Sequence, residues 1–456
     1  MTARFESCFS REKIEEAFLD NVAHRAGRGL DRVDARAFEK RLPEHVDVIH
    51  HKIIDGTYEF TPYLEQLRPK GRDRPRVVSV PTVRDRVVLV LLKDFLHIVF
   101  ANCVARQLPN AVVRELCATL GAIPLEGHYV YRTDIRAFYD SIQHDPLMAR
   151  LRTRVPVPTA MTLLRRALRT PTVAAHARRV SRPKRSTIGV PQGLSISNVL
   201  ANIALWDFDQ TVSGLGVARA RYVDDLLFVA PESEMSLVRT SVEESLAALG
   251  LCVNSDKTFC ESSDTPFDFL GYRFAWPRVS VRMDRADGYL RRIAGVFTAF
   301  RHHVRERERP EWLTDDMLAT RYLDEVNLHI TGAVSGDRRY GWLFFYLEIN
   351  DTELLHRLDG VIRRLAMRAP VFPKAGEVKR LVQAYFEARH RPRGNYIYNY
   401  DTTLANVADQ RMYLGSRGYV SPMELGRMTD GEVVREFERI RARRLAALER
   451  DVGGFS

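Results

Sequence analysis

The sequence predicts an α+β fold followed by a mainly helical region. Up to about residue 278, short runs of β-branched or aromatic residues alternate with amphipathic helical patterns, as expected for a sheet covered by helices. Beyond that point the helical pattern dominates and arginine becomes frequent. The 456 residues suffice for two or three domains, and their 45% hydrophobic and 28% charged content is ordinary for a globular protein.

Each expected element rests on a local pattern of apolar residues and turn formers. Gly27, Gly29 and Asp31 mark a turn between the first two helices, and a basic, turn-rich segment at 67–76 precedes the first short strand. Helices are expected over residues 12–20, 36–54, 84–100, 145–169 (broken near Pro156 and Pro158), 197–209 and 236–249. Strands are expected over residues 77–80, 129–134, 218–222, 226–229, 251–254 and 267–274.

The strongest local signal is the pair Asp224 and Asp225 in a tight turn between two short strands. A hairpin turn exposes both acids, and successive side chains point to opposite faces. Asp224 is therefore expected to face a site squarely, with Asp225 nearby. A turn whose acids are merely solvated is the alternative interpretation.

Another strand, Tyr129–Asp134, delivers a third aspartate at its end. Carboxylates from separate strands can hold two Mg²⁺ ions about 4 Å apart, and Mg²⁺ prefers hard oxygen ligands. One ion would lower the pKa of a primer 3′-hydroxyl, and the other would bind a triphosphate and the leaving pyrophosphate. The sequence therefore predicts a catalytic metal site formed by Asp134, Asp224 and Asp225.

These residues resemble motifs of the reverse transcriptases, and the resemblance covers roughly residues 25–275. Tyr222–Asp225 resembles their Tyr-x-Asp-Asp box, and Asp134 with Phe138 and Tyr139 resembles their first acidic motif. The resemblance implies a right-hand polymerase fold, two Mg²⁺ ions per site, dNTP substrates, an RNA template and a DNA product. It also implies that Tyr139 blocks a ribose 2′-hydroxyl, whereas a plain core aromatic is the alternative.

Two further segments are expected to hold the nucleotide. Val190–Ser197 resembles the family's Pro-Gln-Gly loop, in which Gly193 would let the backbone approach a base pair and Gln192 would offer its amide. Arg76, with Arg74 or Arg72 second, would bind the triphosphate through its forked guanidinium. A basic surface loop is the alternative for these arginines.

The last two motifs concern the leaving group and the primer. Lys257 lies in a segment that resembles the next palm motif; it would protonate the leaving pyrophosphate, or it would simply lie on a solvated turn. Phe269, Leu270, Gly271 and Tyr272 resemble the primer grip, a hairpin that supports the primer end. Plain core packing is the alternative for these apolar residues.

The resemblance also implies the domains of a right hand. The expected parts are an N-terminal extension at 1–45, fingers at 46–128 and 150–189, a palm at 129–149 and 190–278, a thumb at 279–365 and a helical C-terminal extension at 366–456. In the extension, Tyr396, Tyr398 and Tyr400 alternate in a basic setting. They predict a strand with one tyrosine-rich face, and base stacking or a priming hydroxyl are the alternatives.

The N-terminal stretch resembles that of bacterial, group II intron-like reverse transcriptases. The sequence lacks the paired cysteines and histidines of their nuclease and the boxes typical of retron enzymes. It most resembles the unknown-group and abortive-infection reverse transcriptases, which implies antiphage defence and a partner non-coding RNA. Two other functions stay open: a template-independent nucleotidyltransferase on the same palm, and an RNA-binding scaffold with an idle polymerase fold.

Charge and cysteine content restrict the class of protein further. A net charge of +11 favours a polyanionic partner such as nucleic acid. The N-terminus has no apolar run of signal-peptide length, and the longest uncharged stretch, 186–206, is too polar to span a membrane. The five cysteines form no C-x-x-C pair, which argues against a zinc ribbon or a disulfide framework. We therefore expect a cytoplasmic protein without a membrane partner, and a homo-oligomer stays open.

Overall fold

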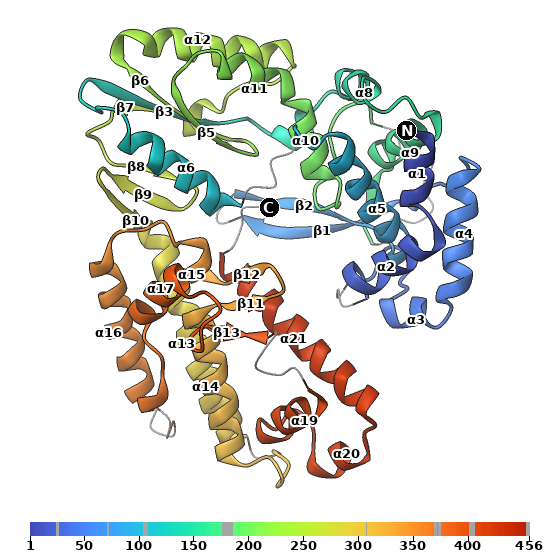
Figure 1. The fold of residues 1–456 in the computed structure, drawn as a ribbon, viewed down its shortest axis with the longest axis vertical. Helices are drawn as coiled ribbons and strands as arrows, with labels where there is room; N and C mark the ends of the chain where they lie inside the picture. Colours follow the sequence, from blue (N-terminus) through green and yellow to red (C-terminus); the bar gives the residue numbers. More distant parts are fainter. Residues whose placement is uncertain are drawn as a thin grey trace. The chain divides into compact units, whose positions relative to one another are not determined.

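The chain forms two compact units (Figure 1). The computed structural model describes residues 1–23, 27–70, 73–103, 108–175, 186–306, 308–368, 372, 375–400 and 406–452, without the side chains of 69, 70, 73, 74, 451 and 452. Unit 1 comprises Met1–Arg106 and Glu126–Ser262, and unit 2 comprises Gln107–Leu125 and Ser263–Ser456. Unit 1 holds most of the predicted fingers and palm, and unit 2 holds the predicted thumb and C-terminal extension.

A four-stranded antiparallel sheet carries the acidic residues of unit 1. Its strands in spatial order are β5 (Ala218–Tyr222), β6 (Asp225–Pro231), β3 (His128–Asp134) and β7 (Phe259–Ser262). The predicted strands at 129–134, 218–222 and 226–229 are confirmed. Helix α12 (Glu232–Ala248) packs on β3 and β6, because its apolar residues recur every three or four positions.

The prediction of a strand at 251–254 is wrong. Val253 forms an isolated bridge to Ile135, and the chain then enters a short 3-10 turn at Ser255–Lys257. The strand that completes the sheet is β7, which pairs with β3. Its sequence, Phe-Cys-Glu-Ser, has no run of β-branched residues, so long-range pairing rather than local pattern decides its place.

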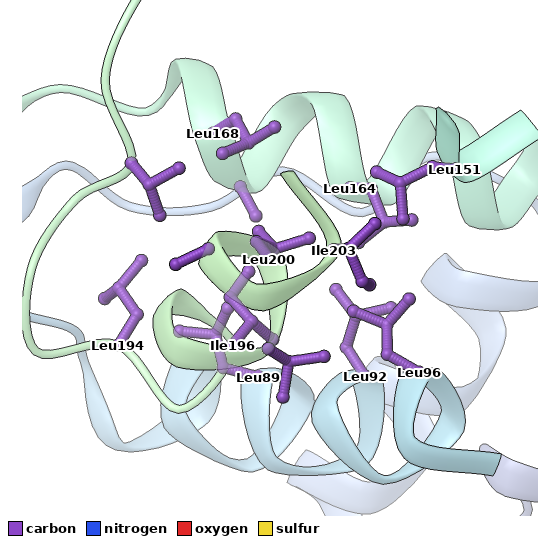
Figure 2. Close-up of a cluster of buried hydrophobic side chains, with 14 of the residues drawn as sticks. Leu89, Leu92, Leu96, Leu151, Leu164, Leu168, Leu194, Ile196, Leu200 and Ile203 are labelled. Carbon is purple, nitrogen blue, oxygen red and sulfur yellow. The ribbon is translucent and has the colours of Figure 1, made fainter. Parts of the chain in front are cut away.

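Four helices of unit 1 share one apolar core: α5 (Val83–Val99), α8 (His144–Arg152), α9 (Pro158–Arg169) and α10 (Ser197–Ala204). Figure 2 shows leucines of α5 below α10 and leucines of α9 above it. Leu194 and Ile196, just before α10, belong to the same core, so the preceding loop is anchored at its end. The predicted helix at 84–100 and the break at Pro156 and Pro158 are confirmed.

Two predicted helices are each divided. The one at 197–209 is α10 followed by α11 (Trp206–Ser213), and the one at 36–54 is α3 (Ala35–Glu39) followed by α4 (Leu42–Ile54). Pro43 lies in the first turn of α4, where its missing N–H costs nothing, and therefore restarts the helix. The remaining N-terminal helices are α1 (Thr2–Cys8) and α2 (Arg11–Asn21), the latter as predicted.

The segment at 67–76, expected as a turn-rich loop, forms most of a long hairpin. Strands β1 (Tyr63–Lys70) and β2 (Asp73–Val80) pair antiparallel, and β4 (Thr172–Val173) adds to β1. Basic side chains interrupt the alternation of apolar and polar residues in both strands. The sequence pattern therefore does not predict strands over this segment. The hairpin brings Arg76 directly opposite Arg68.

Unit 2 combines two small sheets with a set of helices. The first sheet is β8 (Phe267–Phe269), β9 (Tyr272–Ala275) and β10 (Arg278–Val281), so the predicted strand at 267–274 is a hairpin broken at Leu270–Gly271. The second contains β11 (Ala333–Ser335), β12 (Arg338–Tyr340) and β13 (Tyr398–Asn399). The helices are α6 (Pro109–Gly121), α13 (Met283–Arg305), α14 (Asp315–Thr331), α15 (Trp342–Phe345), α16 (Thr352–Arg368), α17 (Leu381–His390), α19 (Val407–Ser416), α20 (Pro422–Arg427) and α21 (Asp430–Val452). Within the described ranges, no helix is both long and apolar enough to cross a membrane.

A buried charge cluster joins α14, α19 and α21. The Asp324 carboxylate accepts hydrogen bonds from Arg444 at 2.8 Å, Tyr413 at 3.0 Å and Arg417 at 3.2 Å. Tyr398 of β13 also donates to it, at 3.4 Å. Burial would raise the pKa of Asp324, but the guanidinium groups of Arg444 and Arg417 outweigh it and hold that pKa below its usual range.

We expect Asp324→Asn to lower the free energy of unfolding by about 3–5 kcal/mol at pH 7, because it leaves Arg444 buried without a counter-charge. The stability contributed by the depressed pKa is present above about pH 4, and it is lost as the pH falls through the lower folded-state value. Urea unfolding of the full chain from pH 7 to pH 3 measures both effects. The double variant Asp324→Leu/Arg444→Met should recover much of the loss, and equal stability of Asp324→Asn and wild type would contradict the prediction.

Candidate active site

Asp134 is held in place on both sides by backbone hydrogen bonds. It lies at the end of β3 directly opposite Asp225, the first residue of β6. The amide of Ile135 donates to the carbonyl of Asp224 at 3.1 Å, and the amide of Asn254 donates to the carbonyl of Asp134 at 2.8 Å. Residues directly opposite in an antiparallel pair have side chains on the same face. The sheet register therefore places Asp134 beside Asp225, and the charge of Asp134 also acts on Asp224, so both acids of the turn lie close to it.

The turn between β5 and β6 is short and strained. Val223 and Asp224 connect the strands, and Val223 adopts φ = +56°, a left-handed conformation that β-branched residues rarely occupy. Arg221 braces this turn, because its guanidinium donates to the carbonyl of Val223 at 3.0 Å and to Asp209 of α11 at 2.6 Å. Arg221 was not among the predicted site residues, although it is a cation directly before the Tyr-x-Asp-Asp segment.

Arg221→Gln should lower kcat about 10–100-fold with little change in KM for dNTP, because the brace orients the turn without contacting substrate. Steady-state incorporation kinetics measure the two constants separately. Arg219→Gln is the matched control, since Arg219 is exposed on the same strand and donates to Ser213. An equal loss of kcat in the two variants would mean that the lost positive charge, and not the contact of Arg221 with the turn, causes the effect.

Burial and neighbouring acidic side chains raise the pKa values of Asp224 and Asp225. Burial, and then the charge of Asp224, raises the pKa of Asp225 to about 6. Burial also raises the pKa of Asp224, with a further contribution from the charge of Asp134, while Lys257 and Arg76 oppose it. Half-buried carboxylates that repel one another favour a bound cation.

Lys257 supplies one such cation from the chain itself. It ends the 3-10 turn at Ser255–Lys257, and its ammonium donates to Oδ2 of Asp134. Asp134 is 8% exposed, and its other oxygen, Oδ1, has no hydrogen-bond partner in the part of the chain that the structure describes. An unsatisfied buried carboxylate oxygen suits a hard divalent cation.

The three aspartates do not form a ready-made coordination cage. No group of three or more His, Cys, Asp or Glu side chains among the described residues has the arrangement of a metal site. The donor types fit a divalent ion, and Asp134, Asp224 and Asp225 are the residues that would hold it. Because the ammonium of Lys257 contacts Oδ2 of Asp134, Oδ1 is the oxygen of this residue that is left for such an ion.

Tyr139 lies next to this acidic corner. The chain turns after β3 through Ala137, at φ = +45°, into the short helix α7 (Phe138–Ser141). Burial, and then the negative charge of Asp224, raises the pKa of Tyr139. Its carbonyl accepts the amide of Val190 at 2.7 Å, which links α7 to the start of the predicted Pro-Gln-Gly loop.

The Pro-Gln-Gly loop docks on strand β2. The carbonyl of Gln192 accepts the amide of Ser79 at 2.7 Å, and Gly193 adopts φ = +94°. A Cβ on Gly193 would lie 2.5 Å from Cγ1 of Val78, so glycine is required here by packing against the hairpin. Arg76 is two residues from Val78 and so lies on the same face of the strand. Arg72 and the side chain of Arg74 lie outside the described residues.

The predicted primer-grip residues belong to unit 2. Leu270, at φ = +48°, and Gly271, at φ = +82°, form the turn between β8 and β9. Phe269, Leu270 and Tyr272 are buried, and the Tyr272 hydroxyl donates to the carbonyl of Phe345. Their described contacts are those of core residues, and contact with a primer stays a prediction.

Residues 68–274 match the family described as reverse transcriptase (RNA-dependent DNA polymerase). They form a reverse transcriptase domain. The domain includes most of the β1–β2 hairpin and all three aspartates of the corner. RNA-directed DNA polymerase is therefore the enzyme class of this domain.

Three curated proteins resemble the chain. YkfC of Escherichia coli is 25% identical over 290 residues, which cover 54% of this chain and 75% of YkfC. An uncharacterized 91 kDa protein in the cob intron of Schizosaccharomyces pombe is 26% identical over 180 residues, covering 37% of this chain and 21% of that protein. A putative COX1/OXI3 intron 1 protein of Saccharomyces cerevisiae is 20% identical over 291 residues, covering 51% of this chain and 34% of that protein.

Among solved structures, the telomerase of Candida albicans in complex with a fragment of telomeric RNA covers 79% of this chain and 66% of its own. The TM-score is 0.40 and the sequence identity is 13%, a likeness too low to support a conclusion. The reverse transcriptase assignment therefore depends on the family match over residues 68–274.

Proposed function

We propose that the protein adds dNTPs to a primer by two-Mg²⁺ phosphoryl transfer at the corner formed by Asp134, Asp224 and Asp225. The observation that carries this proposal is the position of Asp134 directly opposite Asp225, with one buried oxygen of Asp134 lacking a hydrogen-bond partner among the described residues. When bound there, divalent ions would lower the pKa of the primer hydroxyl and neutralise the triphosphate.

The chain's own residues would have distinct parts in this reaction. Arg76 would bind the triphosphate, because it lies on the face of β2 that packs against Gly193 and its charge acts on Asp224. Tyr139 would lie under the sugar, and Gln192 would orient the nucleotide from its loop. Lys257 would leave Asp134 and give its proton to the departing pyrophosphate.

We further propose that the template is a partner non-coding RNA and that synthesis serves antiphage defence. Support comes from the resemblance of the sequence to the unknown-group and abortive-infection reverse transcriptases. The net charge of +11 supports a polyanionic partner. Phage plating efficiency on cells that express wild type or Asp224→Ala tests this role, and equal protection by both proteins would favour a scaffold.

The decisive experiment incubates purified protein with each labelled dNTP or NTP, Mg²⁺ and co-purified RNA, with and without ribonuclease. We expect dNTP incorporation that ribonuclease abolishes. Incorporation that survives loss of the RNA would favour a template-independent nucleotidyltransferase. No incorporation on any supplied template would favour an RNA-binding scaffold.

A further inference from the structure

Helix α16 has an arginine-rich face opposite its buried side. Apolar residues attach it to unit 2 against α13 and α17, and Figure 1 shows α16 at the edge of that unit. The buried residues are Leu354, Leu355, Leu358, Ile362 and Ala366. From His356 onward, the exposed residues of α16 are His356, Arg357, Arg363, Arg364, Met367 and Arg368. We call this set the α16 face.

The arginines of the α16 face follow the helix axis. Arg357, Arg364 and Arg368 are seven and four residues apart, so at 3.6 residues per turn they lie close to one line. With a rise of 1.5 Å per residue, this line is about 16 Å long. Arg363 lies on the same exposed half of the helix.

No carboxylate in the described part of the chain pairs with these four arginines. Two acids of α16 are engaged elsewhere: Glu353 pairs with Arg278 at 3.2 Å, and Asp359 accepts the amide of Val382 at 3.0 Å. Arg364 and Arg368, four residues apart, repel each other, which destabilises a helix. The fold therefore maintains a row of exposed positive charge that its own contacts do not explain.

Helix α21 shows the contrasting arrangement. Its exposed Arg439 pairs with Glu436, three residues earlier, and Arg441 pairs with Glu438 at 3.0 Å in the same way. Glutamates of the same helix thus neutralise the charges of Arg439 and Arg441 on α21, whereas the arginine charges of the α16 face have no such partner among the described residues. Uncompensated guanidinium groups in a row suit a linear polyanion.

We propose that the α16 face binds the phosphate backbone of an RNA strand. The proposal deepens the proposed function and rests on it, because it supplies a docking surface for the RNA partner. A membrane surface fits less well, since the apolar side of α16 is buried in unit 2 and Met367 is the single apolar side chain of the α16 face. Backbone contacts carry little sequence information, so binding should depend on length and salt more than on sequence.

The test compares two double variants with equal loss of charge. Arg364→Gln/Arg368→Gln changes the α16 face, and Arg439→Gln/Arg441→Gln changes paired arginines of α21. Affinity for a labelled 40-nucleotide RNA is measured from 50 to 300 mM salt. We expect the slope of log K against log salt to become shallower by about 1.4 in the first variant, at about 0.7 per lost phosphate contact. The α21 variant should keep the wild-type slope.

Equal salt slopes in wild type and the α16 variant, or equal changes of slope in both variants, would overturn the proposal. It would also be overturned if the α16 variant lost binding to phosphatidylserine vesicles while it kept its RNA binding. Ultraviolet crosslinking of wild-type protein to RNA gives an independent reading, and no crosslinked peptide from 352–368 would also overturn it. Incorporation on a short primer–template should stay at the wild-type level in the α16 variant. Loss of incorporation in every protein, with the salt slopes as expected, would refute the polymerase function and leave the RNA surface standing.

Discussion

Asp134→Asn is expected to lower the rate of single-nucleotide addition by about a thousand-fold or more. Asparagine preserves the size of the side chain, but it removes the charge that would stabilise the ions and the developing charge on the phosphates. Single-turnover incorporation on an RNA template with a DNA primer measures the rate. Titration with Mn²⁺, followed by paramagnetic resonance, should show weaker ion binding independently of turnover.

Asp256→Asn is the matched control for this substitution. Asp256 is exposed in the same short turn as Lys257, so the chemical change is identical but lies outside the acidic corner. We expect its rate and its ion affinity to stay near those of wild type. Addition by Asp134→Asn at a comparable rate would refute the assignment of the corner as the catalytic site.

The strands around the acidic corner were predictable because their signals are local. Two short apolar strands joined by a two-residue connection have few alternative geometries, so the hairpin at 218–231 follows from its own sequence. The helix at 84–100 and the helix break at Pro156 were predictable for the same reason, because their signals lie within the segments themselves. The resemblance to the reverse transcriptases assigns Asp134 and the Asp224–Asp225 pair to one site.

The features that the sequence could not predict depend on distant partners. The register that sets Asp134 opposite Asp225 arises from pairing of β3 with β6 along seven residues, and no local pattern specifies it. Strand β7, with its mixed composition, has its place because β3 offers a free edge. The Lys257–Asp134 contact joins residues 123 positions apart. Long-range contacts of this kind also turned the expected loop at 67–76 into a hairpin.

Tyr139→Ala should reduce the preference for dNTP over rNTP by about 100-fold, because it opens the space that a 2′-hydroxyl would fill. Tyr139→Phe keeps the ring and should keep the preference. The ratio of kcat/KM for dGTP to that for GTP, on one RNA template, measures both. The position of Tyr139 beside Asp224, with its carbonyl bonded to the start of the Pro-Gln-Gly loop, motivates this expectation.

The alternative, that Tyr139 is only a core aromatic, makes the opposite prediction in two measurements. It predicts that Tyr139→Ala lowers the free energy of unfolding by about 3–5 kcal/mol, the usual cost of deleting a buried aromatic ring, while nucleotide preference is unchanged. A residue that lines the nucleotide site instead loses selectivity with a smaller loss of stability, because one face of the ring contacts substrate rather than protein. Measuring both quantities on the same variant therefore separates a steric gate from a packing residue.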